Sequence, residues 1–229
     1  MDVVRKLERQ IREGTMERGS RIAGERDLSK KLGVSRVTLR KALQELRGKG
    51  LLVANRARGW FVAAASVEEK NILRSFTELA RACGIEARSK VLAAVSRMAS
   101  VEETEIFQTP AGAVVFEVSR VRCMGTEPIG VETSRVLLAL CPAIEKADLT
   151  RSSIHKLLET SGAAPASADY ALTAVTADAT TARLLNLEIG FPLLSAEAIT
   201  RDINGTVVEL STTVFRGDRY RFHTTLRSR

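Results

Sequence analysis

Two arginines spaced for anion binding are the first chemically informative feature of this chain. Arg120 and Arg122 lie in the strand-like run 113–124, AVVFEVSRVRCM. Because side chains alternate between the faces of a strand, the two guanidinium groups are expected on one face, roughly 7 Å apart. Guanidinium groups match phosphate and carboxylate geometry by paired hydrogen bonds, so this spacing suits one small anion held by both.

Carboxylates fall in runs expected to neighbour this strand. Glu132 lies in the next strand along the chain, and Glu209 lies in the run TVVELS. Both can accept hydrogen bonds from the hydroxyls or the amine of a ligand. A second interpretation stays open, in which Arg120 and Arg122 only pair with these glutamates across the sheet.

The start of an expected helix adds a different kind of anion donor. Ser153 places a hydroxyl beside free backbone N–H groups at that point. His155, two residues later, is either a ligand donor or a satisfied surface residue. Together with the arginines and glutamates, these groups favour a phosphorylated sugar or amino sugar as ligand, with a small carboxylic acid as second choice.

A basic helix dominates the N-terminal part. The run 28–50, LSKKLGVSRVTLRKALQELRGKG, predicts a short helix, a tight turn at Gly33 and a second helix capped by Ser35. An apolar stripe at helical spacing is made of Leu39, Ala42, Leu43 and Leu46. A different face carries Arg36, Val37, Arg40, Gln44 and Arg47. This arrangement is typical of a recognition helix entering the DNA major groove, while an amphipathic helix pair with a solvated basic face is the alternative.

The elements that would position this helix can be read on both sides of it. A first helix is expected over 2–13, a second over 24–32, and a β-hairpin wing over 51–63. Groups at the tip of the wing that can approach phosphate or the minor groove are Arg56, Arg58 and Gly59.

Charge is distributed unevenly along the chain. Residues 1–62 hold 16 basic and 7 acidic residues, a net charge of +9, whereas residues 63–229 hold 19 and 20. All of the excess positive charge therefore belongs to the segment with the helix pair. This asymmetry indicates a phosphate-backbone binder attached to a part that does not touch nucleic acid.

The rest of the chain has the pattern of an antiparallel sheet with helices. Residues 63–70 lack an apolar period and are expected to be a linker, and a helix follows over 71–84. Strand-like runs are 89–98, 113–124, 129–138, 167–177, 192–202 and 206–217. Short helices are expected near 101–107, 151–160 and 179–185. The predicted class is α+β, with residues 71–229 as one domain on an antiparallel sheet.

Other function classes find little support. There is no apolar segment for export or membrane crossing, so a cytoplasmic protein with no membrane partner is expected. Three scattered cysteines and two histidines give no metal-ligand spacing. No nucleophile motif or glycine-rich phosphate loop appears, so no catalytic residues and no cofactor are predicted.

Residues 1–62 resemble the winged helix-turn-helix of the GntR family of bacterial transcription regulators. The family pattern is matched by Glu25-Arg26-Asp27-Leu28, Val34-Ser35-Arg36, Thr38, Arg40, Gly50-Leu51 and Gly59-Trp60-Phe61-Val62. The resemblance implies DNA contacts by Arg26, Ser35, Arg36, Thr38, Arg40 and Gly59. Val37 departs from the usual threonine and offers a methyl contact to thymine without a hydrogen bond.

Residues 71–229 are similar to the UTRA effector-binding domain of the HutC subfamily, which has a chorismate-lyase-like fold. The resemblance is carried by Ser75-Phe76-Thr77-Glu78, Arg120-x-Arg122, Pro128-Ile129-x-Val131-Glu132, Ser153-Ile154, Val208-Glu209-x-Ser211 and the ending from Phe215 to Phe222. It implies an effector site made of Ser75, Phe76, Thr77, Arg120, Arg122, Glu132, Ser153, His155 and Glu209.

The resulting hypothesis is a homodimeric repressor that binds a palindromic operator and senses a small anionic metabolite. Two winged helices related by a twofold axis are expected, because one alone makes too few base contacts for operator specificity. One rival is a lyase-like enzyme domain fused to a DNA-binding arm, and another is a DNA-coating protein without an effector.

Overall fold

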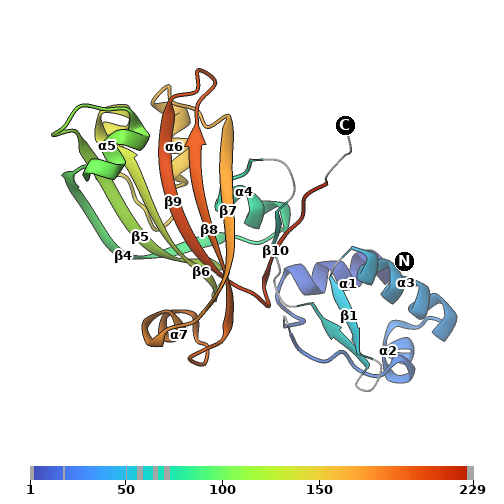
Figure 1. Cartoon of the computed structure of the whole chain (residues 1–229). Helices are drawn as coiled ribbons and strands as arrows, with labels where there is room; N and C mark the ends of the chain where they lie inside the picture. The colour runs from blue at the N-terminus through green and yellow to red at the C-terminus, as the bar shows by residue number, and fades with distance from the viewer. Residues whose placement is uncertain are drawn as a thin grey trace. The chain divides into compact units, whose positions relative to one another are not determined.

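The computed structural model describes residues 3–17, 19–49, 51–55, 59–63, 67–69 and 73–225. The chain divides into two compact units, Met1–Ser66 and Val67–Arg229 (Figure 1). Arg56 and Arg58, expected at the tip of the wing, lie outside the described residues.

Three helices form most of the first unit: α1 (Val3–Arg12), α2 (Glu25–Leu32) and α3 (Arg36–Gly48). Gly33 ends α2 in the left-handed conformation, with φ of 67°, which a residue without a Cβ adopts without strain. Ser35 then begins α3 by accepting a hydrogen bond from the backbone N–H of Thr38 at 3.1 Å. The sequence between the two helices therefore specifies a tight turn.

A two-stranded hairpin completes the first unit. Strands β1 (Leu52–Asn55) and β2 (Gly59–Val62) pair antiparallel, with Leu52 opposite Val62. The buried core that joins the helices to this hairpin includes Leu7, Ile11, Leu28, Leu39, Ala42, Leu43, Leu46, Leu52 and Val62. All four residues of the apolar stripe predicted on α3 are buried there, so the opposite side of α3 is left for solvent or DNA.

The second unit is built on a six-stranded antiparallel sheet in the order β4-β5-β6-β9-β8-β7. Its strands are β4 (Ala87–Met98), β5 (Val114–Met124), β6 (Glu127–Leu137), β7 (Ser167–Thr176), β8 (Pro192–Arg201) and β9 (Val207–Arg216). The predicted α+β class with an antiparallel sheet is thus confirmed, and each of the six strand-like runs forms one of these strands.

Helices pack against both faces of this sheet, as two core clusters on opposite sides of β5 show. On one face, α6 (Ile154–Thr160) and the short 3-10 helix η2 (Pro142–Lys146) cover a core cluster that includes Phe116 and Val118 of β5. On the other face, α7 (Ala179–Leu185) covers Val121 of the same strand. Two further helices are α4 (Phe76–Ala82) and α5 (Val101–Phe107), and a second 3-10 helix, η1 (Leu138–Leu140), precedes η2.

The expected linker differs from the observed structure. Val67–Glu69 forms a strand, β3, that pairs in parallel with β10 (Tyr220–Phe222), so these residues belong to the second unit. The apolar pattern of the sequence gave no sign of this strand. Its pairing uses backbone groups, and a short stretch of charged residues can supply those as well as an apolar one.

Candidate functional site

The beginning of α3 presents exposed polar side chains. Arg36, Thr38 and Arg40 are exposed, and Val37 is 68% exposed. The hydroxyl groups of Ser35 and Thr38 lie 2.8 Å apart, in addition to the cap that Ser35 makes to the backbone. Ser35 therefore fixes the start of the helix, while the side chains that follow it point away from the core.

Arg40 is not free on this surface. Its Nε and Nη2 donate to Glu25 Oε2 at 3.2 and 2.7 Å. The other oxygen of the same carboxylate accepts a bond from Trp60 Nε1 at 3.1 Å. The residue predicted to read bases is thus held by α2 and, through Glu25, is linked to strand β2 of the wing.

Two further described residues predicted to contact DNA are Arg26 and Gly59. Arg26 in α2 is exposed and its Nε lies 3.4 Å from Asp27 Oδ1. Gly59 begins β2 with φ of 90°, a conformation that favours glycine at this corner of the wing.

Arg120 is a buried, fully engaged side chain in the second unit. It lies opposite Glu132 in the β5–β6 pairing and is 2% exposed. Its Nε and Nη2 both donate to Glu132 Oε2, the former at 3.1 Å. Its Nη1 donates to the carbonyl oxygens of Ser152 and Leu149 at 3.2 and 3.5 Å. Arg120 therefore joins β5, β6 and the segment that leads into α6.

Arg122 shares the face of β5 with Arg120, as strand alternation predicts, but it is less completely satisfied. It is 3% exposed, its Nη1 donates to Ser89 Oγ at 2.9 Å, and its nearest carboxylate oxygen, in Glu132, is 3.7 Å away. The ring of Phe76 lies over the guanidinium, with the centroid 4.6 Å from Cζ. The buried Nε has no hydrogen-bond partner. An unused donor in a buried site is costly unless a ligand or water occupies it.

The other carboxylate of this site has a different partner from the one considered for it. Glu209 pairs with His155, whose Nε2 lies 3.1 Å from Glu209 Oε2, and not with the arginines. The ion-pair interpretation therefore holds for Glu132 and is wrong for Glu209. His155 itself is a half-buried member of the site and not a free surface residue.

Two helix starts border the site. Ser75 and Glu78 form a capping box at the start of α4, with Ser75 N donating to Glu78 Oε2 at 2.8 Å. This box sets Phe76, the first residue of α4, over Arg122. Ser153 caps α6 by accepting a bond from Lys156 N at 3.4 Å, and Thr77 faces a groove next to the cavity that Arg122 lines.

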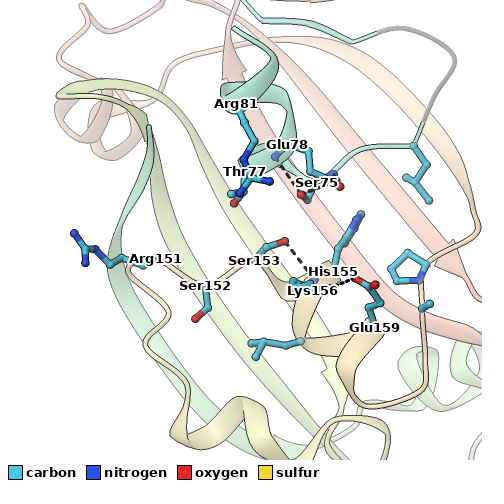
Figure 2. Close-up of a pocket in the computed structure, with 14 residues that line it drawn as sticks. Ser75, Thr77, Glu78, Arg81, Arg151, Ser152, Ser153, His155, Lys156 and Glu159 are labelled. Carbon is cyan, nitrogen blue, oxygen red and sulfur yellow. Dashed lines mark hydrogen bonds and ion pairs between the residues drawn. The ribbon is translucent and has the colours of Figure 1, made fainter. Parts of the chain in front are cut away.

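The site has an inner and an outer part. The inner cavity, of about 60 Å³, is lined by the predicted residues Ser75, Phe76, Arg120, Arg122, Glu132, Ser153, His155 and Glu209, together with residues of β7, β8 and β9. The outer groove, of about 710 Å³, lies between α4 and the start of α6 and shares Ser75, Ser153 and His155 with the cavity (Figure 2). It also carries Thr77, Glu78, Arg81, Arg151 and Lys156.

Burial and pairing set the charges of the inner cavity. Burial lowers the pKa of Arg122 to about 10, because Glu132 and Glu209 offset only part of the desolvation. Burial alone would raise the pKa of Glu132, but Arg122 and Arg120 hold it below its ordinary value. Burial also opposes the charged form of His155, yet Glu209 raises the pKa of this imidazole above its ordinary value. The charged side chains that line the cavity are three arginines (Arg74, Arg120 and Arg122) and two glutamates, so its formal charge is positive with His155 neutral. Protonation of His155 adds one more positive charge, which suits an anion.

Some members of these sites could not be found from sequence patterns. Ser89 meets Arg122 because the β4–β5 register places them opposite each other, and that register is invisible in the sequence. Glu25 meets Arg40 and Trp60 across 15 and 35 positions of chain, with no spacing rule to connect them. The motif Glu25-Arg26-Asp27-Leu28 includes Glu25, but nothing in the sequence connects this residue with Arg40 or Trp60.

Within the part of the chain that the structure describes, no cluster of three or more His, Cys, Asp or Glu side chains could hold a metal ion. Nor does that part contain a helix both long and apolar enough to cross a membrane.

The fold and the two sites together define a class of protein. A small basic unit exposes a helix-turn-helix and its wing, and a separate α+β unit encloses a charged cavity beside an open groove. This is the architecture of a DNA-binding regulator with a second, α+β domain.

Comparisons with known proteins identify the family. The family model described as "Bacterial regulatory proteins, gntR family" matches residues 1–62, and the UTRA domain model matches residues 82–221. The transcriptional repressor NagR of Bacillus subtilis is 29% identical over 96% of this chain and 91% of its own length. A probable fructoselysine utilization operon transcriptional repressor of Escherichia coli is 28% identical over 91% of this chain and 86% of its own length.

The fold is also found in solved structures. The crystal structure of PhnF from Mycobacterium smegmatis superposes with a TM-score of 0.81 and 24% identity, covering 99% of this chain and 100% of that one. The chain belongs to the UTRA-domain family and carries the GntR-family DNA-binding domain. It is therefore a member of a family of DNA-binding transcription regulators.

Proposed function

We propose that this protein is a repressor whose operator binding is controlled by a small anionic metabolite held in the second unit. The observation that carries the proposal is the incomplete pairing of the Arg122 side chain. This guanidinium is buried, its nearest carboxylate oxygen is 3.7 Å away, and its Nε lacks a partner. An anionic group in the inner cavity would satisfy that donor and offset the desolvation that lowers the pKa of Arg122.

The volumes of the inner cavity and the outer groove indicate that different parts of the ligand occupy them. A cavity of about 60 Å³ holds a few water molecules or one small anionic group, not a whole sugar phosphate. The outer groove of about 710 Å³ falls in the usual range for ligand pockets. The anionic head therefore enters beside Arg122, and the body lies between α4 and α6 (Figure 2).

The lining of the groove favours a polar body. Glu78, Arg81 and Lys156 face it, together with the hydroxyls of Thr77 and Ser152. A phosphorylated sugar or amino sugar can bond to these groups, and a small carboxylic acid is the second candidate. A long aliphatic chain would desolvate the charged groups without replacing their hydrogen bonds. The name of the E. coli relative, a repressor of fructoselysine utilization, supports the sugar class.

A series of aromatic contacts leads from the cavity to the segment where the second unit begins. Tyr170 and Phe215 line the cavity. The Phe215 ring stacks on Tyr220 at 3.8 Å between centroids, and Tyr170 lies 6.0 Å from Phe222. Tyr220 and Phe222 belong to β10, which pairs with β3 at residues 67–69, where the second unit begins. A ligand that moves these aromatic rings would thus act on the segment next to the DNA-binding unit, and would reposition that unit without altering its interior.

The operator should be read by two copies. The exposed face of α3 offers few side chains for base contacts, and a homodimer would present two such faces to the half-sites of a palindrome. Sedimentation of the protein alone and with a duplex selected from a random pool would measure the copies per duplex. One copy on a single half-site, at full affinity, would contradict the dimeric arrangement.

Calorimetric titration of the whole protein tests the ligand assignment. The panel should contain inorganic phosphate, sugar phosphates, amino sugar phosphates, small carboxylates and a fatty acid. We expect a phosphorylated sugar to bind, with Arg122→Ala abolishing binding and Arg81→Ala weakening it. Arg88→Ala, which changes an exposed arginine outside both cavities, is the control. Tight binding of an uncharged or aliphatic ligand, undiminished by Arg122→Ala, would show that the cavity is wrongly assigned.

A further inference from the structure

A single carboxylate joins the three elements that form the DNA-binding surface. Glu25 is the first residue of α2, Arg40 lies in α3, and Trp60 lies in strand β2 of the wing. Glu25 Oε2 accepts two bonds from Arg40, and Glu25 Oε1 accepts one from the indole of Trp60. Both oxygens of one side chain are therefore used to connect the wing with the recognition helix.

The geometry leaves Arg40 able to bind DNA. A guanidinium carries five N–H donors, and the Glu25 bonds use the side edge made of Nε and Nη2. The outer edge, made of Nη1 and the second Nη2 hydrogen, has no other partner among the described residues. That outer edge is a two-pronged donor of the kind that pairs with O6 and N7 of guanine. Since the side chain of Arg40 is 63% exposed, this edge faces solvent while the side edge is held.

The Trp60 end of the connection is itself fixed. The carbonyl oxygen of Trp60 accepts a bond from Ile22 N at 2.9 Å, and Arg21 bridges to Phe61 beside it. The indole also packs against the core of the first unit. Glu25 is thus bonded to a residue that backbone pairing and core packing hold in place. Hydrogen bonds from Arg40 and then from Trp60 keep the Glu25 carboxylate ionised, with its pKa below the ordinary value.

We propose that Glu25, held by Trp60, is a positioning residue for DNA recognition: it orients the guanidinium of Arg40 so that its outer edge meets a base. A free arginine samples many rotamers, and ordering it on binding costs conformational entropy. A side chain already held in place has lost that freedom before DNA arrives. Glu25 therefore contributes to sequence preference without needing to touch DNA.

The test measures sequence preference as the ratio of affinities for a selected duplex and a random duplex. The selected duplex is obtained from a random pool with the whole wild-type protein. Glu25→Gln keeps the size of the side chain and removes its charge. Glu13→Gln is the matched control, because Glu13 is an exposed acid of the same unit that contacts neither Arg40 nor Trp60. Both variants lose one negative charge, so both should bind random DNA slightly more tightly.

Of these two variants, Glu25→Gln alone should lose sequence preference. The expected loss is roughly tenfold, which is the scale of one bidentate base contact. Trp60→Phe should lose part of it, because the ring remains and the donor to Glu25 is gone. In an Arg40→Ala background, Glu25→Gln should have no further effect on the ratio. A Glu25→Gln protein with the preference of Glu13→Gln, or equal losses with and without Arg40, would overturn the proposal.

Fluorescence separates positioning from a general loss of structure. Trp60 is the single tryptophan of the chain, so its emission reports only on this connection. Glu25→Gln should shift the emission while the circular dichroism spectrum stays native, and Glu13→Gln should change neither. If Glu25→Gln fails to fold, Trp60→Phe carries the test alone. A native Trp60→Phe protein with undiminished sequence preference would then overturn the proposal.

Discussion

The two units of this protein use arginine in opposite ways. Arg40 in the first unit is 63% exposed, whereas Arg120 and Arg122 in the second are 2% and 3% exposed. An exposed guanidinium gains little from its carboxylate partner, because water screens the attraction. A buried guanidinium that loses its carboxylate is left as an unpaired charge in the interior.

This difference separates binding from stability. Removing an exposed arginine of α3 should weaken DNA binding and leave the fold intact. Removing a buried arginine of β5 should destabilise the second unit, even where that arginine also contacts a ligand. The contrast can be tested by substitutions whose expected effects range from several kcal/mol to a small dependence on pH.

The largest effect is expected from Arg120→Ala. The change leaves Glu132 with only a distant partner and removes the bonds to Ser152 and Leu149, so we expect a loss of about 3–5 kcal/mol in the free energy of unfolding. Urea titration followed by circular dichroism measures it. Arg88→Ala, which breaks an exposed pair with Glu86, should cost less than about 1 kcal/mol.

Trp60 supplies an internal check on that result. It lies in the first unit, so its fluorescence should report the unfolding of that unit at an unchanged urea concentration in Arg120→Ala. Equal stability of Arg120→Ala and Arg88→Ala would mean that the buried pair contributes nothing. The contrast between the two units would then disappear.

A smaller effect is expected from Arg36→Ala, on binding alone. If Arg36 reads a base edge, its loss should cost about 1–3 kcal/mol on the selected operator and little on random DNA. Arg56→Ala, at the expected tip of the wing, should weaken binding to both about equally, as loss of a phosphate contact does. Equal losses from Arg36→Ala on both duplexes would contradict the role of α3 in base recognition.

The sequence predicted the periodic features of this protein better than its pairings. Alternation placed Arg120 and Arg122 on one face, and the helical stripe of α3 is buried as expected, because both follow from backbone geometry alone. The partner of Glu209 could not be predicted in the same way. It depends on where α6 sets His155 against β9, which is a matter of tertiary packing.

The segment expected to be a linker also has a pairing that the sequence pattern does not predict. Residues 67–69 carry no apolar pattern, and their pairing with 220–222 joins chain segments about 150 positions apart through backbone hydrogen bonds. In the first unit, the hydrogen bonds of Glu25 are equally hard to predict, since its two partners come from elements that are distant in sequence. Motifs predicted which residues belong to the sites, and only the folded chain shows which of them meet.

The coupling free energy between ligand binding and operator binding should be smaller than the free energy of either binding event. If ligand and operator favour different arrangements of the chain, each must change the affinity of the other by the same factor. The corresponding coupling free energy is typically about 1–3 kcal/mol. Phe222→Ala removes the contact with Tyr170 and should reduce this coupling by roughly 0.5–2 kcal/mol, while each ligand alone binds as before. Calorimetry of the ligand with and without saturating operator measures it. Identical ligand affinities in wild type would rule out the coupling.

The smallest expected effect is a dependence of stability on pH that belongs to the second unit. Glu209 raises the pKa of His155 above its ordinary 6.5, against the effect of burial, with Glu132 and Glu78 acting in the same direction. A group with a raised pKa in the folded state stabilises it fully below the unfolded pKa. That contribution is lost as pH rises through the folded pKa. The free energy of unfolding should therefore fall as pH rises from 6 to 8.

His155→Gln should remove this slope, because glutamine keeps a hydrogen bond to Glu209 but carries no proton that titrates in this range. His223, the other histidine, is exposed, so His223→Gln is the matched control and should keep the wild-type slope. Binding of inorganic phosphate to the cavity should weaken over the same interval, since the cavity loses one positive charge when His155 becomes neutral. A slope that survives in His155→Gln would assign the titration to another group. If the stability of the wild type does not change with pH, the pair with Glu209 does not shift the pKa of this imidazole. The net charge of the cavity then stays the same over the whole range.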